Sequence, residues 1–227
     1  MPRTRNDRTL AIGSLLLSSA FCMGLLVVRK HYTGDGFRFL AWNLFLAWIP
    51  FLLAVLAYDS SKRGFRVSFL PLAALWLLFF PNAPYIVTDL FHLRDLAGVA
   101  PLWFDVLVFT AFAWTGLLLG LISVYLMQAA VRRLAGSFLS WAAVVPALAL
   151  ASFGIYLGRF ERWNSWDAIN RPHALLASIH AHLAEPQAYP HAVAYTALFT
   201  GFLTVAYLVL YAFGRLVPSG DVPRPRP

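Results

Sequence analysis

Two short stretches of the sequence hold most of the residues that could do chemistry. In the first, Asp89, His92 and Asp95 recur at intervals of three residues. On a helix, side chains at this spacing lie along one stripe. A carboxylate and an imidazole one turn apart can share a proton or hold a metal ion. Asp89 and His92 are therefore the candidate catalytic pair.

The residues before this pair predict a break in the helix. Pro81 and Pro84 lack an amide hydrogen, so two carbonyls of the preceding turn lose their helical partners. Asn82 either satisfies a freed backbone group or binds a ligand. The alternative without chemistry is a proline kink followed by a short interfacial helix, with Thr88 as its N-cap and Asp89 in its first turn.

The second stretch, Gly-Arg-Phe-Glu-Arg-Trp-Asn-Ser-Trp-Asp, alternates charged and aromatic side chains. The planar guanidinium groups of Arg159 and Arg162 can grip a phosphate, and the two carboxylates can neutralise them. Tryptophans at this position also suit a membrane interface. The candidate ligand-binding residues are Asn82, Arg159, Glu161, Arg162, Asn164 and Asp167. No residue is assigned to a metal, and the cofactor stays open.

The composition indicates that membrane-spanning helices position these stretches. Of the 227 residues, 60% are hydrophobic and 12% are charged, whereas soluble domains have about 45–50% apolar and about 25% charged residues. This excludes a disordered protein, a disulfide scaffold and an ordinary cytosolic enzyme. Six apolar runs are long enough to cross a hydrocarbon core of about 30 Å; they cover residues 10–28, 37–58, 67–87, 102–131, 138–157 and 191–213.

The predicted fold is therefore all-α: a polytopic membrane helix bundle of about six transmembrane helices. Residues 1–216 form one transmembrane domain, and the proline-rich tail 217–227 is expected to be disordered. Three weaker features accompany this bundle. An acid, Asp105, begins the fourth run; two Gly-x-x-x-Gly pairs, at 116–120 and 154–158, allow close helix packing; and residues 175–183 suggest a short amphipathic helix on the membrane.

The positions of the basic residues predict how the bundle is oriented. Eleven of the 18 Lys and Arg residues lie at the termini and in the second and fourth loops, which share one side of the membrane. Cytoplasmic loops are enriched in these residues, so both termini are expected in the cytoplasm. The loops with the two chemical stretches, 88–101 and 158–190, are separated by two crossings. They therefore lie together on the opposite, extracytoplasmic face.

The net charge of +8 also indicates contact with the membrane. The basic residues stand between apolar runs, where they meet lipid head groups, so the expected partner is the lipid bilayer and nucleic acid is excluded. The single cysteine, Cys22, lies inside an apolar run and allows no internal disulfide.

Together the two motifs resemble those of a bacterial family of predicted integral membrane proteins. The residues that carry the resemblance are Phe80-Pro81-Asn82-Ala83-Pro84-Tyr85 with Thr88-Asp89-Leu90-Phe91-His92-Leu93, and Arg159-Phe160-x-Arg162-Trp163-Asn164-Ser165-Trp166-Asp167. The family is catalogued as a domain of unknown function. The resemblance extends from the second helix to the sixth and implies a membrane location, but it supplies no activity.

These observations lead to one interpretation and two alternatives. The chain is expected to be a multi-pass bacterial inner-membrane protein with a polar site on the extracytoplasmic face that recognises a polar or lipid head group. The alternatives are a membrane-embedded enzyme for a lipid-linked substrate, with Asp89 and His92 as acid and base or metal ligands, and a structural subunit of a membrane complex. Transport is less favoured, because the polar groups gather near one face.

Overall fold

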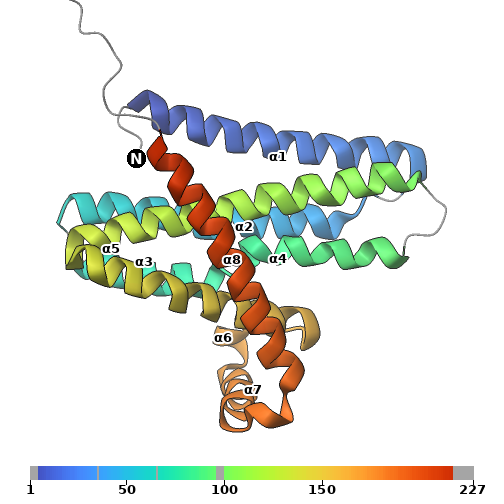
Figure 1. Cartoon of the computed structure of the whole chain (residues 1–227). Coiled ribbons are helices and arrows are strands. Elements are labelled where there is room, and N and C mark those ends of the chain that lie inside the picture. The colour runs from blue at the N-terminus through green and yellow to red at the C-terminus, as the bar shows by residue number, and fades with distance from the viewer. Residues whose placement is uncertain (1–4, 35, 65, 96–99, 217–227) are drawn as a thin grey trace, which may run out of the picture.

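Most of the long helices of the chain lie along a common bundle axis, the last long helix crosses them obliquely, and a small helical projection lies beside the bundle (Figure 1). The computed structural model describes residues 5–34, 36–64, 66–95 and 100–216. Within these ranges there are helices and no strands. In chain order the elements are α1 (Arg5–Thr33), α2 (Arg38–Lys62), α3 (Arg66–Phe79), α4 (Asn82–Tyr85), the 3-10 helix η1 (Ile86–Asp95), α5 (Leu102–Phe160), α6 (Asp167–Asn170), α7 (Pro172–Ala184), the 3-10 turn η2 (Pro186–Ala188) and α8 (Pro190–Leu216).

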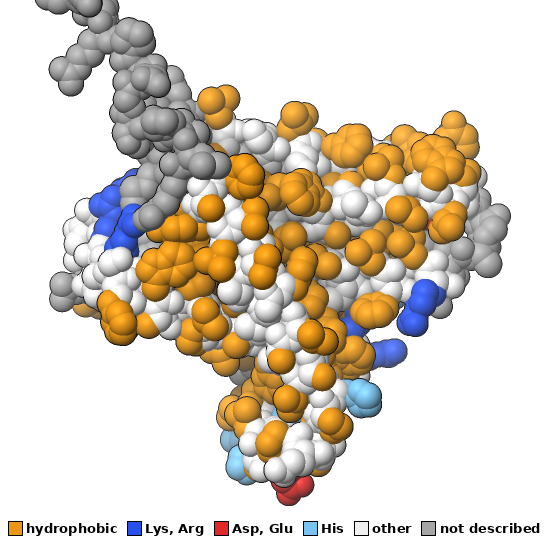
Figure 2. Space-filling view, in the orientation of Figure 1, with side chains coloured by type: hydrophobic (Ala, Val, Ile, Leu, Met, Phe, Trp, Pro, Cys, Tyr) orange, Lys and Arg blue, Asp and Glu red, His pale blue; other side chains and the backbone are white. Residues whose placement is uncertain are grey.

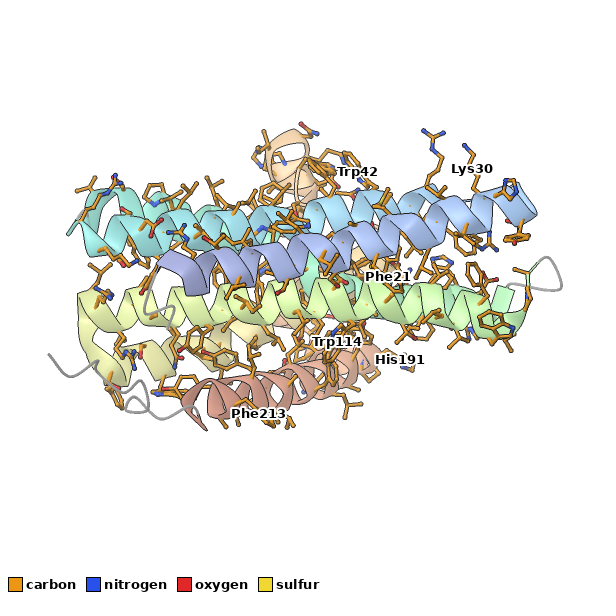
Figure 3. The ribbon with its side chains drawn as sticks, turned by 90° about the horizontal axis from the view of Figure 1, so that it is seen from above. Phe21, Lys30, Trp42, Trp114, His191 and Phe213 are labelled. Atoms are coloured by element: carbon orange, nitrogen blue, oxygen red, sulfur yellow. The ribbon has the colours of Figure 1, made fainter. Side chains whose placement is uncertain are left out.

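The surface of the bundle is that of a membrane protein. Five helical segments of the described residues are long and apolar enough to cross a membrane. Their outer faces expose large hydrophobic side chains: Phe21, Trp114 and Phe213 are each more than half exposed (Figure 3). Figure 2 shows such side chains along the length of one face, with basic side chains gathered toward its ends. Apolar surface on this scale requires lipid around it, so the predicted helical membrane fold is confirmed.

The fourth and fifth apolar runs form a single 59-residue helix, α5, with a break in it. A straight helix of this length would span about 88 Å, nearly three times a hydrocarbon core. Gly136 interrupts it with a φ of 88°, a conformation that glycine adopts without steric cost. Figure 1 shows that the two arms, residues 102–135 and 137–160, run back along each other. Six crossings with both termini in the cytoplasm stay a prediction, and the tail 217–227 lies outside the described residues.

The third apolar run is longer and more irregular than predicted. Instead of one helix that ends near residue 87, α3 stops at Phe79 and the chain continues through α4 and η1. Pro81 and Pro84 cause the break because they withdraw two amide donors. At the break the N–H of Ala83 donates to the carbonyl oxygen of Phe80 at 3.1 Å. Nδ2 of Asn82 donates to the carbonyl oxygen of Phe79, which would otherwise pair with Ala83, at 2.9 Å. This is one of the two roles that the sequence offers for Asn82, and ligand binding by this residue stays a prediction.

The expected helix cap at Thr88 is wrong. The Thr88 hydroxyl donates to the carbonyl oxygen of Tyr85, 2.7 Å away, within a helix that has already begun. The 3-10 helix η1 still places Asp89 and His92 on one side, because side chains three residues apart eclipse each other in this geometry. The candidate pair therefore belongs to the continuation of the third membrane segment rather than to a separate interfacial helix.

The kinked segment is clamped between the two arms of α5. A Cβ atom added to Gly116 on the first arm would lie 2.7 Å from the carbonyl oxygen of Ala83. A Cβ atom added to Gly154 on the second arm would lie 2.8 Å from Cγ of Pro81. Both distances are too short for a real side chain. Each of the two arms thus approaches the kink closely at one Gly-x-x-x-Gly pair.

Candidate functional site

Asp89 and Arg159, from the two chemical stretches, form a buried ion pair. Nη2 of Arg159 lies 3.1 Å from Oδ1 of Asp89, and the two side chains are only 14% and 2% exposed. The other carboxylate oxygen, Oδ2, accepts a hydrogen bond of 2.7 Å from Nδ2 of Asn43 on α2. The structure therefore brings η1, the end of α5 and α2 to one point and leaves both carboxylate oxygens of Asp89 with partners.

The guanidinium group of Arg159 is occupied by the protein itself. Its Nε donates to the hydroxyl of Thr88 at 3.1 Å, and its Nη2 also donates to the carbonyl oxygen of Thr88. Its Nη1 is 3.4 Å from Nε2 of His92, and its planar group lies 5.1 Å from the centre of the Tyr85 ring. An arginine held on all sides in this way fixes the geometry of its neighbours.

The candidate acid–base pair is linked through this arginine. Asp89 and His92 both contact Arg159, on different nitrogen atoms. The His92 ring also packs against Phe39, with ring centres 4.9 Å apart. Across the described residues no three His, Cys, Asp or Glu side chains are grouped to hold a metal ion; the side chain of Asp95 lies outside the description. His92 is partly exposed while Asp89 is buried, so only His92 is open to a ligand.

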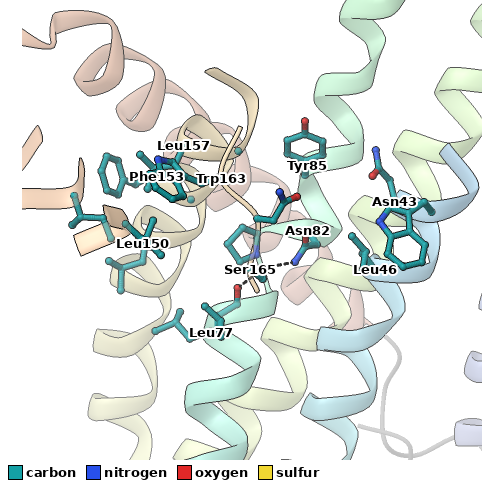
Figure 4. Close-up of a pocket in the computed structure, with 18 of the residues that line it drawn as sticks. Asn43, Leu46, Leu77, Asn82, Tyr85, Leu150, Phe153, Leu157, Trp163 and Ser165 are labelled. Atoms are coloured by element: carbon teal, nitrogen blue, oxygen red, sulfur yellow. Dashed lines mark hydrogen bonds between the residues drawn. The ribbon is translucent and has the colours of Figure 1, made fainter. Parts of the chain in front are cut away.

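A cavity of about 360 Å³ opens beside Asn82, where the second chemical stretch passes the kink (Figure 4). Nδ2 of Asn82 donates to the hydroxyl of Ser165 at 2.9 Å, and that hydroxyl donates to the carbonyl oxygen of Leu78 at 3.1 Å. Neutral polar residues line this part of the cavity: Asn43, Asn82, Tyr85, Asn164 and Ser165. These hydrogen bonds thus join the kink to the loop that contains Ser165 at the polar end of the cavity.

The rest of the cavity wall is apolar and comes from four helices. Residues of α2, α3, the second arm of α5 and α7 contribute to it: Leu46, Leu77, Leu150, Phe153, Leu157, Leu175, Ile179 and Leu183. In Figure 4 the leucine and phenylalanine side chains of α5 lie on one side of Asn82 and those of α2 on the other. No Asp, Glu, Lys or Arg of the described chain lines the cavity. It is therefore an amphipathic space without a charged lining.

Helix α7 turns its apolar side toward this cavity. Figures 1 and 3 place α6 and α7 beside the long helices rather than at their end. Glu161 attaches α7 to the loop: one of its oxygens accepts a hydrogen bond of 2.6 Å from the Ser178 hydroxyl, and the other lies 2.9 Å from Nε2 of His182. These contacts of Glu161, one of the predicted ligand-binding residues, hold the wall of the cavity in place.

Asp167 has a comparable structural role. Its Oδ2 accepts a hydrogen bond of 2.8 Å from the backbone N–H of Asn164, and its Oδ1 pairs with Arg171 at 3.0 Å. The N–H of Asn164, followed by the hydrogen bond and charge of Arg171, lowers the pKa of Asp167. Among the predicted residues, Asn82 and Asn164 line the cavity. Arg162 is exposed with a φ of 61° and does not line it.

A second buried ion pair ties α1 to α5. Nε of Arg29 donates to Oδ1 of Asp105 at 2.7 Å, and both side chains are 3% exposed. The guanidinium of Arg29 also covers the ring of Phe37 at 3.4 Å. The sequence marks Asp105 as an acid at the start of the fourth apolar run, but it does not identify Arg29 as its partner. This pair fastens the start of α5, and it does not line the cavity.

Three lining residues were missed from the sequence. Tyr85 and Ser165 stand inside the two motifs but were not assigned a role. Asn43 could have been found, because it is a polar residue within the otherwise apolar run 37–58, and polar side chains in membrane helices seek hydrogen-bond partners inside the protein. Its partner, however, is 46 residues away.

The matches with known proteins agree with this architecture and add no chemistry. The family described as "Protein of unknown function (DUF1361)" matches residues 42–207. That range contains the kink, the Asp89–Arg159 pair and every wall of the cavity. No curated protein and no solved structure matches the chain.

Proposed function

The chain belongs to the DUF1361 family of proteins of unknown function, and we propose that it is a bacterial inner-membrane protein that binds an amphipathic, lipid-type molecule. The ligand's hydrocarbon part would lie along the apolar wall of the cavity. Its head group, polar but without net charge, would meet the amides and hydroxyls beside Asn82. By the distribution of basic residues, this site is on the extracytoplasmic face.

The observation that carries the proposal is the division of the cavity into an apolar wall and a neutral polar end. A volume of about 360 Å³ is within the range of small-molecule sites. Amide and hydroxyl groups can both donate and accept hydrogen bonds, which suits hydroxyl or amide groups of a ligand. A charged head group would be left without a counter-charge in this lining, and an unpaired charge in an apolar setting is costly.

The Asp89–Arg159 pair does not line the cavity but contacts two residues that do. Asp89 holds Asn43, whose side chain lines the cavity, while Arg159 packs against Tyr85, which also lines it. Buried side chains with locked partners keep such polar groups in one arrangement. This reassigns the two charged residues from ligand contact to positioning of the residues that make it.

An enzyme acting on a lipid-linked substrate is the second candidate, and the contact between His92 and Arg159 favours it. His92 is partly exposed, so it is the residue that could exchange a proton with a substrate. Asp89 would act only through Arg159, because its oxygens are engaged and it is 1% exposed. Replacing His92 by Gln would abolish function in an enzyme. In a binding protein it would leave function nearly unchanged.

The binding proposal is tested by filling the cavity. Ile179→Trp on α7 places a large side chain into it, and Leu176→Trp is the matched control, because Leu176 is 61% exposed on the same helix and does not line the cavity. Each protein is purified from cells in mild detergent, and the molecules that remain bound are identified by native mass spectrometry.

The expected result is a specific bound molecule in the wild type and in Leu176→Trp, reduced at least tenfold in Ile179→Trp. Ser165→Ala should weaken its retention without unfolding the protein, because it removes only a hydroxyl from the polar end. Equal retention by wild type and Ile179→Trp, with both proteins folded, would show that the cavity is not the binding site.

A further inference from the structure

A second groove, on the far side of the bundle axis from Asn82, has its own chemistry. It has a volume of about 330 Å³ and lies between α1, α2 and α5. Its apolar walls include Leu15, Phe51, Val55 and Leu126, and Arg8 and Lys62 stand at one end. Asn43 and Lys62 are 19 residues apart on the same helix, which corresponds to about 28 Å along its axis. The basic end of the groove is therefore remote from the polar end of the cavity.

Among the described side chains, cations outnumber anions at the end of the groove that holds Arg8 and Lys62. Nη1 of Arg8 lies 2.9 Å from Oδ2 of Asp59, and Nζ of Lys62 lies 3.6 Å from Oδ1 of the same residue. One carboxylate thus serves two cations. A third cation, Arg133, lies 5.4 Å from the ring centre of Tyr58, which lines the groove. The Arg8 and Lys62 side chains are 40% and 42% exposed, so their charges are accessible from outside.

We propose that this groove binds an anionic phospholipid. The phosphate would sit at Arg8 and Lys62, where it would share these cations with Asp59, and one acyl chain would follow the apolar walls between α1 and α5. Basic residues beside a crevice between membrane helices are a recurrent arrangement for acidic lipid head groups. An inorganic phosphate would gain only the weak, salt-screened attraction of the exposed cations, because the rest of the groove offers it no polar partner. This site is independent of the cavity beside Asn82.

The experiment compares lipids that differ only in head-group charge. The purified full-length protein in a neutral detergent is titrated with phosphatidylglycerol, with phosphatidylcholine of the same acyl chains, and with inorganic phosphate, while its unfolding temperature is followed. A ligand that binds only the folded protein raises this temperature, and the rise grows with the logarithm of the ligand concentration relative to its dissociation constant. We expect phosphatidylglycerol to raise the unfolding temperature by several degrees. Phosphatidylcholine should bind with at least tenfold lower affinity, and phosphate should leave the unfolding temperature unchanged.

Two variants locate the effect. Ala11→Trp fills the groove and leaves both cations in place, whereas Leu17→Trp is its control on an outward position of the same helix, 73% exposed. Lys62→Gln removes a cation but keeps the Arg8–Asp59 pair, and Lys30→Gln removes one that does not line the groove. Ala11→Trp and Lys62→Gln should each lose at least tenfold in affinity for phosphatidylglycerol, and the controls should not.

Three outcomes would overturn the proposal. The first is equal stabilisation by the two lipids, and the second is an equal effect of free phosphate, which would indicate that only surface charge binds. The third is unchanged binding in Lys62→Gln, and this variant decides even if Ala11→Trp does not fold. None of these results bears on the cavity beside Asn82, because neither Ala11 nor Lys62 lines that cavity.

Discussion

At the scale of single residues, the structure depends most on the contact between Arg159 and Asp89. Replacing Arg159 by Gln leaves a carboxylate that is 1% exposed with Asn43 as its remaining donor. Removing one partner of a buried ion pair costs about 3–5 kcal/mol. Because the Arg159 side chain keeps some exposure, we expect a loss near the lower end, about 3 kcal/mol. It would be measured as the free energy of unfolding in detergent.

The double variant Asp89→Asn/Arg159→Gln shows whether the loss arises from the pair. It should be less destabilised than the sum of the two single changes, because no buried charge is left unpaired. Arg171→Gln is the matched control: its pair with Asp167 is formed by an arginine side chain that is 60% exposed, and exposed pairs contribute about 0–1 kcal/mol. Additive losses in the double variant would mean that the two residues act separately.

The pKa of Asp167 predicts that the stability of the protein depends on pH. Its folded-state pKa is lowered, chiefly by the N–H of Asn164, so the unfolded state binds its proton more readily than the folded state does. The stabilisation is therefore complete above the unfolded pKa of about 4 and is lost as the pH falls through the lower, folded value. Asp167→Asn should lack this acid-induced component. Identical pH profiles of wild type and variant between about pH 5 and pH 2 would contradict this assignment.

At the scale of elements, the clamp around the kink predicts opposite effects of one substitution at different glycines. Gly116→Ala and Gly154→Ala should destabilise the protein by about 1–3 kcal/mol, the usual cost of overpacking, because the new methyl groups would meet Ala83 and Pro81. Gly201→Ala in α8 has open space around it, so it should be neutral or stabilising by up to about 1 kcal/mol. Thermal unfolding in detergent compares the three. Similar effects at all three positions would mean that the clamp does not constrain the kink.

Elements of this fold could be predicted where a local signal determines them. The apolar runs indicate α1, α2, both arms of α5 and α8, because length and hydrophobicity alone determine a membrane helix. Pro81 and Pro84 indicate the break, and the spacing of Asp89 and His92 indicates that they share a side. The continuation through η1 was not predicted, since Thr88 has the side chain of a helix cap and only its contact with Tyr85 shows otherwise.

The candidate site could be predicted only in part, because its partners are distant in sequence. The topology argument predicts that the two chemical stretches lie on one face, and the 3.1 Å contact between Asp89 and Arg159 agrees with it. The role of Arg159 could not be read from the sequence, since a free and an internally bonded guanidinium look alike there. The same holds for the pair of Arg29 with Asp105, which depends on how α1 packs against α5.

At the scale of the whole molecule, the prediction concerns orientation. The excess of Lys and Arg at the termini predicts that both lie in the cytoplasm, and the reversal at Gly136 is then expected on the cytoplasmic side as well. Reporter fusions at Gly136 and after Leu216 should report a cytoplasmic location. Fusions within residues 96–100 and after Ala188 should report the opposite side. A fusion after Leu216 that reports the extracytoplasmic side would rule out six crossings with a cytoplasmic N-terminus.

The residues, the elements and the whole fold together are proposed to hold an amphipathic molecule between the kink and α7. A photo-crosslinking amino acid at Ile179, activated in intact membranes, tests it most directly. Ile179 lines the cavity and Leu176, on the same helix, does not. The account predicts an adduct at Ile179 with one enriched, lipid-type molecule that has a neutral polar head, while Leu176 captures the general lipids of the membrane. Capture of the same general lipids at both positions would contradict it.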